Sequence, residues 1–186
     1  MARVRLNETS DLPEEHRPMF ERIGQDPMGV LNIYRALSHS PEALRRFMAF
    51  GRYLLMQGKL DPKLREMAIL RAGMICRSPY EVGQHIRIGR AAGLTDAQIK
   101  AIAAPHTGIF DPREMAVLAY AGEMTAAARV SDATFEAVRS FFNEEEIVEL
   151  TLVTGFYNLV SRTLNALEVD VDAPAQRDLQ ALELDL

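Results

Sequence analysis

The stretch LREMAILRAGMICRSPYEVGQH, residues 64–85, decides the fold. An Asp-Pro pair at 61–62 precedes it and a second proline follows Ser78, which predicts two helix starts with a very short link between the helices. A link of that length folds the second helix back along the first. We therefore expect an antiparallel helical hairpin, with one helix from Asp61 to about Cys76 and the other ending at Gly93.

The rest of the chain has similar signals for helix starts. Side chains that accept hydrogen bonds stand before a proline or an acidic first turn, where backbone amides are free. They predict helices that begin at Ser40, Thr95, Asp111, Ser131 and Asn143, the last reaching about Leu167, after two weaker helices at 13–22 and 28–38.

Strand signals are almost absent, so the predicted fold class is all-α. No second domain is evident, and residues 1–186 are predicted to form one domain. Its core lies at about 40–168. A helical extension at 1–39 precedes the core, and an acidic, less ordered tail at 169–186 follows it.

The composition limits the classes of function. The chain has 186 residues, 48% of them hydrophobic, and 26 acidic against 21 basic residues give a net charge of −5. Phosphate backbones need a concentrated basic face, so nucleic acid is not an expected partner. The apolar segment 147–160 contains Glu149 and Asn158 and is too short to span a bilayer. With one cysteine and no leader-like start, we expect a cytoplasmic protein.

Potentially reactive side chains are concentrated in the hairpin. Glu66 lies about 15 Å before the link and His85 about 10 Å beyond it, at a rise of ~1.5 Å per residue, so their side chains can meet. Glu81 precedes His85 by four residues and shares its face, where a carboxylate raises the imidazole pKa or fixes its tautomer. With Tyr80, these residues form the candidate site.

Each of these residues also has a structural interpretation. Ser78 and Glu81 fit a capping box, in which both side chains bind backbone amides at the helix start. His85 could be a histidine of the core or of an interface. Glu66 could be a solvated acid near a helix start, and Tyr80 could be a partly buried anchor.

Other polar groups surround the hairpin. Cys76 has no second cysteine, which excludes a dithiol relay and favours a small core residue. A metal is not expected, because carboxylate-rich bundle sites repeat a Glu-x-x-His spacing on two helices and this chain does not. A guanidinium suits a substrate carboxylate, and the nearby arginines are Arg71, Arg77, Arg87 and Arg90. The sequence does not decide between them; our candidates for substrate binding are Arg77 and Ser78.

Two patterns concern packing. Asn158, Arg162 and Asn165 form a polar stripe in an apolar helical run, which favours an oligomer interface slightly over a pocket lining. Long apolar helices and nine methionines also suggest an apolar face that needs a partner. Gly73 and Gly83 are expected to allow close helix approach.

A short sequence motif occurs at two of the predicted helix starts. Asp-Pro followed by Arg-Glu-Met-Ala occurs at 61–68 and again at 111–116. The motif is too short to establish a repeat, and we interpret it as packing.

The stretch from Leu60 to Ile102 resembles the carboxymuconolactone decarboxylase family, which includes alkyl hydroperoxidase D. The later segments FDPREMAVLAYAGEMT and VTGFYNLVSRTLNAL are similar to the rest of that family, so the likeness covers most of residues 40–168. The resemblance implies an all-helical bundle built around the hairpin and a homotrimer or homohexamer. Members differ in chemistry, so the fold does not fix the reaction.

In the peroxidase branch of this family a glutamate serves a Cys-x-x-Cys pair, and a histidine follows four residues later. The matching positions are Glu66, Ser78, Glu81 and His85, with Tyr80 between the two sulfur positions. Because Ser78 and Glu81 occupy the two cysteine positions, the resemblance excludes the dithiol route to peroxide reduction. It implies instead acid–base chemistry in which His85 is the general acid, Glu66 or Glu81 orients it, and Tyr80 donates to an oxyanion.

The predicted function is a cofactor-independent, decarboxylase-like enzyme for a small carboxylated lactone or related cyclic acid. Two alternatives stay open. One is a peroxidase-like antioxidant protein that uses Cys76 as a single thiol with an external reductant. The other is a non-catalytic helical oligomer or binding module, which predicts that no cavity lies beside the acid–imidazole cluster.

Overall fold

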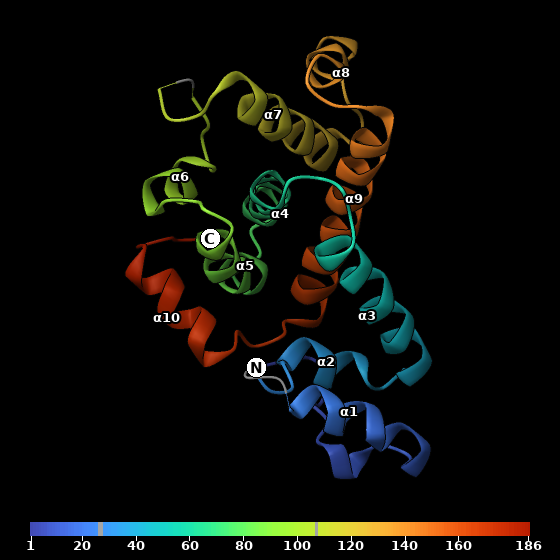
Figure 1. Cartoon of the computed structure of the whole chain (residues 1–186). Coiled ribbons are helices and arrows are strands. Elements are labelled where there is room, and N and C mark those ends of the chain that lie inside the picture. The colour runs from blue at the N-terminus through green and yellow to red at the C-terminus, as the bar shows by residue number, and fades with distance from the viewer. Residues whose placement is uncertain (26–27, 107) are drawn as a thin grey trace.

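The computed structural model describes residues 1–25, 28–106 and 108–186. Over these residues the chain is helical without any strand, which confirms the all-α prediction (Figure 1). Two short 3-10 turns, η1 (Thr9–Asp11) and η2 (Glu14–His16), come first. The α-helices that follow are α1 (Arg17–Gly24), α2 (Asn32–Leu37), α3 (Pro41–Met56), α4 (Pro62–Ile75), α5 (Pro79–Ala91), α6 (Asp96–Ala101), α7 (Pro112–Ala127), α8 (Asp132–Arg139), α9 (Glu144–Leu167) and α10 (Ala173–Ala181).

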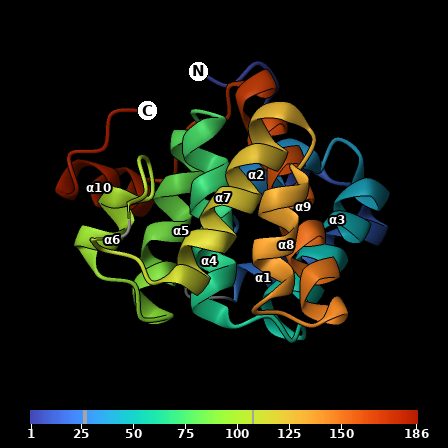
Figure 2. The ribbon, with the colours of Figure 1, turned by 90° about the horizontal axis from the view of Figure 1, so that it is seen from above.

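Helix α4 lies at the centre of the bundle, where α5, α7 and α9 pack around it (Figure 2). Its residues from Leu64 to Leu70 are all buried, including the charged Arg65 and Glu66. A charged side chain in such a position needs a partner inside the core, because an isolated buried charge is strongly destabilising. The fold therefore requires an ion-paired centre on α4.

The predicted helix starts are confirmed by their caps. The side chains of Asp61, Thr95, Asp111, Ser131 and Asn143 each accept a hydrogen bond from a backbone amide of the first helical turn. Helix α3 also starts after Ser40, although the Ser40 side chain forms no cap bond. The first α-helix begins later than predicted, because residues 14–16 form a 3-10 turn.

The link between α4 and α5 is a tight helix end. Arg77 takes a left-handed conformation with φ of 49°. The Ser78 amide then donates to the Gly73 carbonyl at 2.9 Å, and the Arg77 amide donates to the Met74 carbonyl at 3.1 Å. These are the two bonds of a Schellman motif, which reverses the chain and produces the predicted hairpin. A methyl group at position 73 would lie 3.0 Å from the Val82 side chain, so Gly73 does allow α4 and α5 to approach closely.

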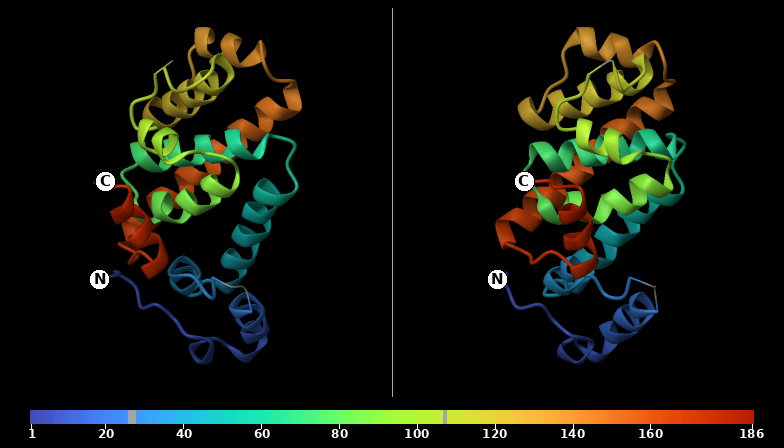
Figure 3. Two further views of the ribbon diagram at one scale, coloured as in Figure 1. Left: turned by 60° about the vertical axis from the view of Figure 1, so that its left-hand side comes forward. Right: turned by 90° about the vertical axis from the view of Figure 1, so that its left-hand side faces the viewer.

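The acidic segment 169–186, for which the sequence predicted no helix, is helical in part. It forms α10, which packs against α5 (Figure 3). Gly83 permits this contact rather than the hairpin contact, because a methyl group there would lie 3.0 Å from the Ala175 carbonyl oxygen. Buried Leu179 and an ion pair of 2.8 Å between Arg90 and Asp178 hold α10 in place.

Within the described ranges, no helix combines the length and the apolar character that crossing a membrane requires.

Candidate functional site

Glu66 of α4 and His85 of α5 meet in the core, as the hairpin geometry predicted. The Nδ1 atom of His85 lies 2.6 Å from Oε2 of Glu66. Its Nε2 atom lies 3.0 Å from Oε1 of Glu81, one turn earlier on α5. Both nitrogens of the imidazole therefore face a carboxylate, an arrangement that suits the protonated ring with its two N–H donors.

Arg65 is a fourth charged member of the site. Its Nε atom lies 3.2 Å from Oε1 of Glu66, and Arg65 is only 9% exposed. We refer to Arg65, Glu66, Glu81 and His85 as the buried tetrad. Two cations and two carboxylates cancel in formal charge, which is how the core accommodates four ionisable groups.

The carboxylates control the proton affinity of His85. Burial by itself lowers the pKa of the imidazole, but Glu66 and Glu81 outweigh that effect and raise the pKa to about 10. His85 is therefore protonated at neutral pH, in the form that donates a proton.

Tyr157 of α9 completes the wall of the site. Its ring stands edge-on to the His85 ring, with centroids 4.9 Å apart. Burial raises the pKa of Tyr157 well above its usual value, and Glu81 and Glu66 raise it further, so the phenol stays neutral. Sequence reasoning missed Tyr157 because it lies in an apolar run 72 positions after His85. It missed Arg65 because neighbouring helix positions ordinarily point apart.

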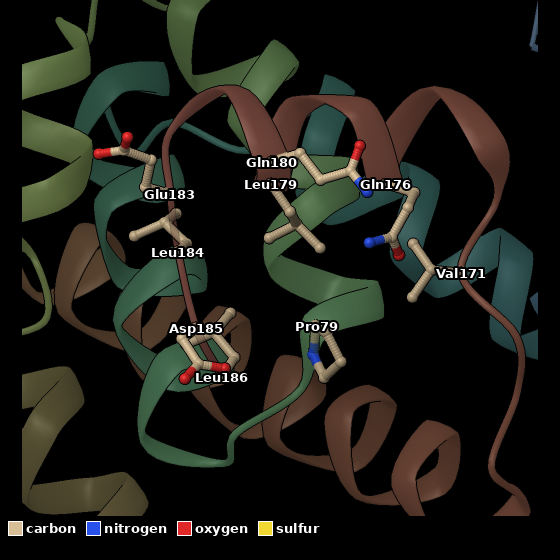
Figure 4. Close-up of a pocket in the computed structure, with 9 residues that line it drawn as sticks. All are labelled: Pro79, Val171, Gln176, Leu179, Gln180, Glu183, Leu184, Asp185 and Leu186. Atoms are coloured by element: carbon tan, nitrogen blue, oxygen red, sulfur yellow. The ribbon is translucent and has the colours of Figure 1, made fainter.

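The tetrad is closed to solvent in the single chain. Glu66 is 0% exposed, Glu81 3% and His85 5%. A hollow of about 510 Å³ lies between the start of α5 and the C-terminal residues, and Figure 4 shows the residues that line it. A second hollow, of about 370 Å³, shares Pro79 and Val171 with the first. Pro79 borders both hollows, and neither is lined by a tetrad residue.

The capping box predicted for Ser78 and Glu81 is wrong. Ser78 does stand at the start of α5, but its side chain forms no cap bond, and its buried hydroxyl has no hydrogen-bond partner. The Glu81 carboxylate reaches His85 instead of the backbone. The buried His85 ring needs a carboxylate partner in the core, and Glu81 is within reach of its Nε2 atom.

Tyr80 was predicted to belong to the candidate site, but its hydroxyl does not contact the buried tetrad. Its hydroxyl donates to Asp172 and accepts from the Ile33 amide at 3.0 Å. Gln84, one turn further along α5, donates to the same Asp172 oxygen at 2.8 Å. Tyr80 is thus a buried anchor for the segment before α10, as in the structural alternative given for it above. Because its hydroxyl proton is donated to Asp172, that proton is not free for an oxyanion.

Arg77 also lies apart from the tetrad. It occupies the exposed link between α4 and α5, whereas Glu66 is buried about three turns back along α4. The arginine that does contact the site is Arg65. The substrate-binding role of Arg77 stays a prediction.

The polar stripe on α9 forms hydrogen bonds within the chain. Asn165 donates to the Cys76 carbonyl at 2.8 Å, Asn158 donates to Thr125 at 2.9 Å, and Arg162 donates to the Thr125 carbonyl at 3.2 Å. Together these bonds fasten the hairpin link and α7 to α9.

Cys76 belongs to this same cluster and not to the tetrad. Its thiol lies 3.7 Å from Oδ1 of Asn158. Burial raises the pKa of Cys76, and Arg162 opposes that shift only in part. The sulfur is held as a thiol, which is a poor nucleophile.

Across the part of the chain that the structure describes, no three His, Cys, Asp or Glu side chains are grouped so that they could hold a metal ion.

Solved structures with the same fold are known. An uncharacterized peroxidase-related protein from Ralstonia eutropha JMP134, described as an alkylhydroperoxidase AhpD core, is 25% identical, with 94% of each chain covered and a TM-score of 0.82. A peroxidase-related protein from Silicibacter sp. TM1040 is 26% identical, with 92% of each chain covered and a TM-score of 0.80. The debrominase Bmp8 is 15% identical, with 95% of each chain covered and a TM-score of 0.80, and shares the fold alone. No curated protein sequence matches the chain.

The chain thus has the all-helical, AhpD-like fold. The profile of the Carboxymuconolactone decarboxylase family matches residues 41–123, which include all four members of the buried tetrad. The resemblance predicted from the sequence is confirmed.

Proposed function

We propose that the protein is a cofactor-independent acid–base enzyme that acts on a small carboxylated lactone or related cyclic acid, as a decarboxylase would. The observation that carries the proposal is His85 held between Glu66 and Glu81. Of these three residues, Glu81 matches a position at which the peroxidase branch of the family has a thiol. A protonated imidazole with fixed orientation is a general acid.

The two carboxylates would have different roles. Glu66 binds Nδ1 at the shorter distance, 2.6 Å, from a fully buried position on α4, and would keep the ring oriented. Glu81 faces Nε2, so this nitrogen would deliver the proton once Glu81 turns aside. Arg65 is the guanidinium beside the pair, and we assign it to the substrate carboxylate.

The proposed step is balanced without a cofactor. The carbon–carbon bond to the carboxylate breaks and carbon dioxide leaves. The electron pair moves toward the lactone carbonyl and forms a dienolate, and the Nε2 proton of His85 then adds to carbon. The histidine then regains a proton from solvent, in a state of the protein in which the tetrad is open to water.

Access to the tetrad requires movement, because its residues are at most 9% exposed. This closure favours the second candidate, a non-catalytic helical protein in which the tetrad only stabilises the core. The third candidate, peroxide reduction by Cys76, has no support from its geometry, since the thiol is partly buried, has a raised pKa and lies outside the tetrad.

The test is the release of carbon dioxide from a panel of small carboxylated lactones and cyclic acids. His85→Ala is expected to reduce turnover by ~10²–10⁴-fold, the usual contribution of a general acid. His106→Ala, at an exposed position, is the matched control and should leave turnover unchanged. Wild-type protein that turns over no member of the panel, or full activity in folded His85→Ala, would favour the non-catalytic candidate.

A further inference from the structure

Helix α9 carries an apolar row that its own chain leaves uncovered. Val148, Leu152 and Leu159 are 56%, 40% and 52% exposed. With Gly155 they are spaced by four, three and four residues, which places all four positions on one face of the helix. This face lies opposite the residues of α9 that pack on α4.

Gly155 at the middle of this row is not required by the fold. A methyl group there would meet only Met124, at 3.4 Å, which is an ordinary contact. Glycine inside a helix is nonetheless less stable than alanine. A missing side chain at a partly exposed position in an apolar row is best explained by close approach of something outside the chain.

The charged residues at the two ends of the apolar row indicate which partner approaches it. Exposed Glu145 lies one turn before Val148, and exposed Arg162 lies one turn after Leu159. If a second α9 is laid antiparallel about a midpoint between Leu152 and Gly155, each Leu152 stands opposite a Gly155. In the same register Val148 stands opposite Leu159, and Glu145 opposite Arg162.

We propose that α9 pairs antiparallel with α9 of a second copy of this chain, with Leu152 fitting over Gly155 and Glu145 pairing with Arg162 at each end. The row is self-complementary in shape and in charge, as a two-fold symmetric contact demands. This inference does not depend on the proposed catalytic function.

Helix α3 would extend the contact beyond the two α9 helices. It exposes Phe50, Tyr53 and Met56, and the Phe50 ring lies 5.4 Å from the ring of Phe156 on α9. Specific interfaces bury on the order of 1,200–2,000 Å² in total, so neighbouring apolar side chains are needed. A two-fold contact gives an even number of copies, which agrees with the predicted homohexamer and not with a lone homotrimer.

A charge-swap experiment on the full chain tests the pairing, with sedimentation equilibrium as the measurement. Glu145→Arg should weaken association at least ~10-fold, because two arginines would then face each other at both ends of the contact. Arg162→Glu should do the same. The double variant Glu145→Arg/Arg162→Glu should restore association. Glu21→Arg, an exposed change on α1, is the control.

Two further variants separate association from folding, since Arg162 also binds Thr125 within the chain. Leu152→Asp should yield folded monomers. Gly155→Gln should weaken association while the melting temperature of the monomer stays the same or rises. A monomeric or trimeric wild type, unaffected single variants, or a double variant that is not restored would overturn the proposal.

Discussion

Helices α4 and α7 start from nearly the same sequence and use it differently. Each begins with an Asp cap and a proline and continues into Arg-Glu-Met-Ala, but α4 has two additional residues, Lys63 and Leu64, before that motif. Glu114 is the third residue of α7 and completes a capping box with Asp111, with hydrogen bonds of 2.8 and 3.0 Å. Glu66 is the fifth residue of α4 and reaches His85 instead.

The difference shows that a residue's position relative to the helix start decides its role. An acid in the third helical position can bend back to the cap, whereas two positions later it has passed the free amides and must find another partner. The two helix starts are also connected, because Lys63 of the added pair donates to Glu114 at 2.6 Å. Substitutions at equivalent positions in the two helices therefore test this interpretation directly.

The largest effect is expected from the two glutamates. Glu66→Gln removes one partner of a buried ion pair and should lower the free energy of unfolding by about 3–5 kcal/mol. Glu114→Gln keeps a side chain that can complete a capping box, so its loss should be about 1 kcal/mol. Urea unfolding of both variants gives the comparison. Equal losses would contradict the assignment of different roles.

The next effect is the pH dependence of stability. His85 binds its proton more tightly when folded, with a pKa of about 10 against a reference value of 6.5. The stabilisation is therefore complete below pH 6.5 and is lost as the pH rises toward 10, by at most about 1.4 kcal/mol per pH unit. Urea unfolding at several pH values measures the slope.

His85→Gln is the control for that slope, because it has no proton to release in this range. Glu114→Gln should keep the slope of the wild type. A wild-type stability that stays level from pH 7 to 10 would show that the tetrad does not hold His85 protonated.

The smallest effect should be the same in both helices. Asp61 accepts amide hydrogen bonds from Lys63 and Leu64, and Asp111 accepts one from Glu114. Asp61→Ala and Asp111→Ala should each cost about 1 kcal/mol, and Asn at either position should recover most of it. Thermal unfolding of the four variants would reveal a difference if the two starts are not equivalent.

The parts of the fold that were predictable are those set by local sequence. The Asp-Pro starts, the short link at Cys76–Ser78 and the helical rise were sufficient to bring Glu66 and His85 together. The partner of Glu81 was not predictable, because a cap and an imidazole lie within reach of the same carboxylate and only the packed core favours the second.

Contacts between distant parts of the sequence could not be predicted in this way. Tyr80 and Asp172 are 92 positions apart, and no periodicity in either segment indicates that they meet. The same holds for Tyr157, whose place beside His85 depends on how α9 crosses the hairpin. Local patterns therefore identified the acid–imidazole pair but not the walls around it.

The bonds of Asp172 have a consequence for the order of events during synthesis. Asp172 binds the Tyr80 hydroxyl, the Gln84 amide and the backbone amide of Asn32, all of which leave the ribosome far earlier. Until residues 172–182 emerge, those groups and the Ala175-facing surface of α5 remain open to water. The nascent chain is thus expected to stay loosely packed around α5, and available to chaperones, until translation has passed α10.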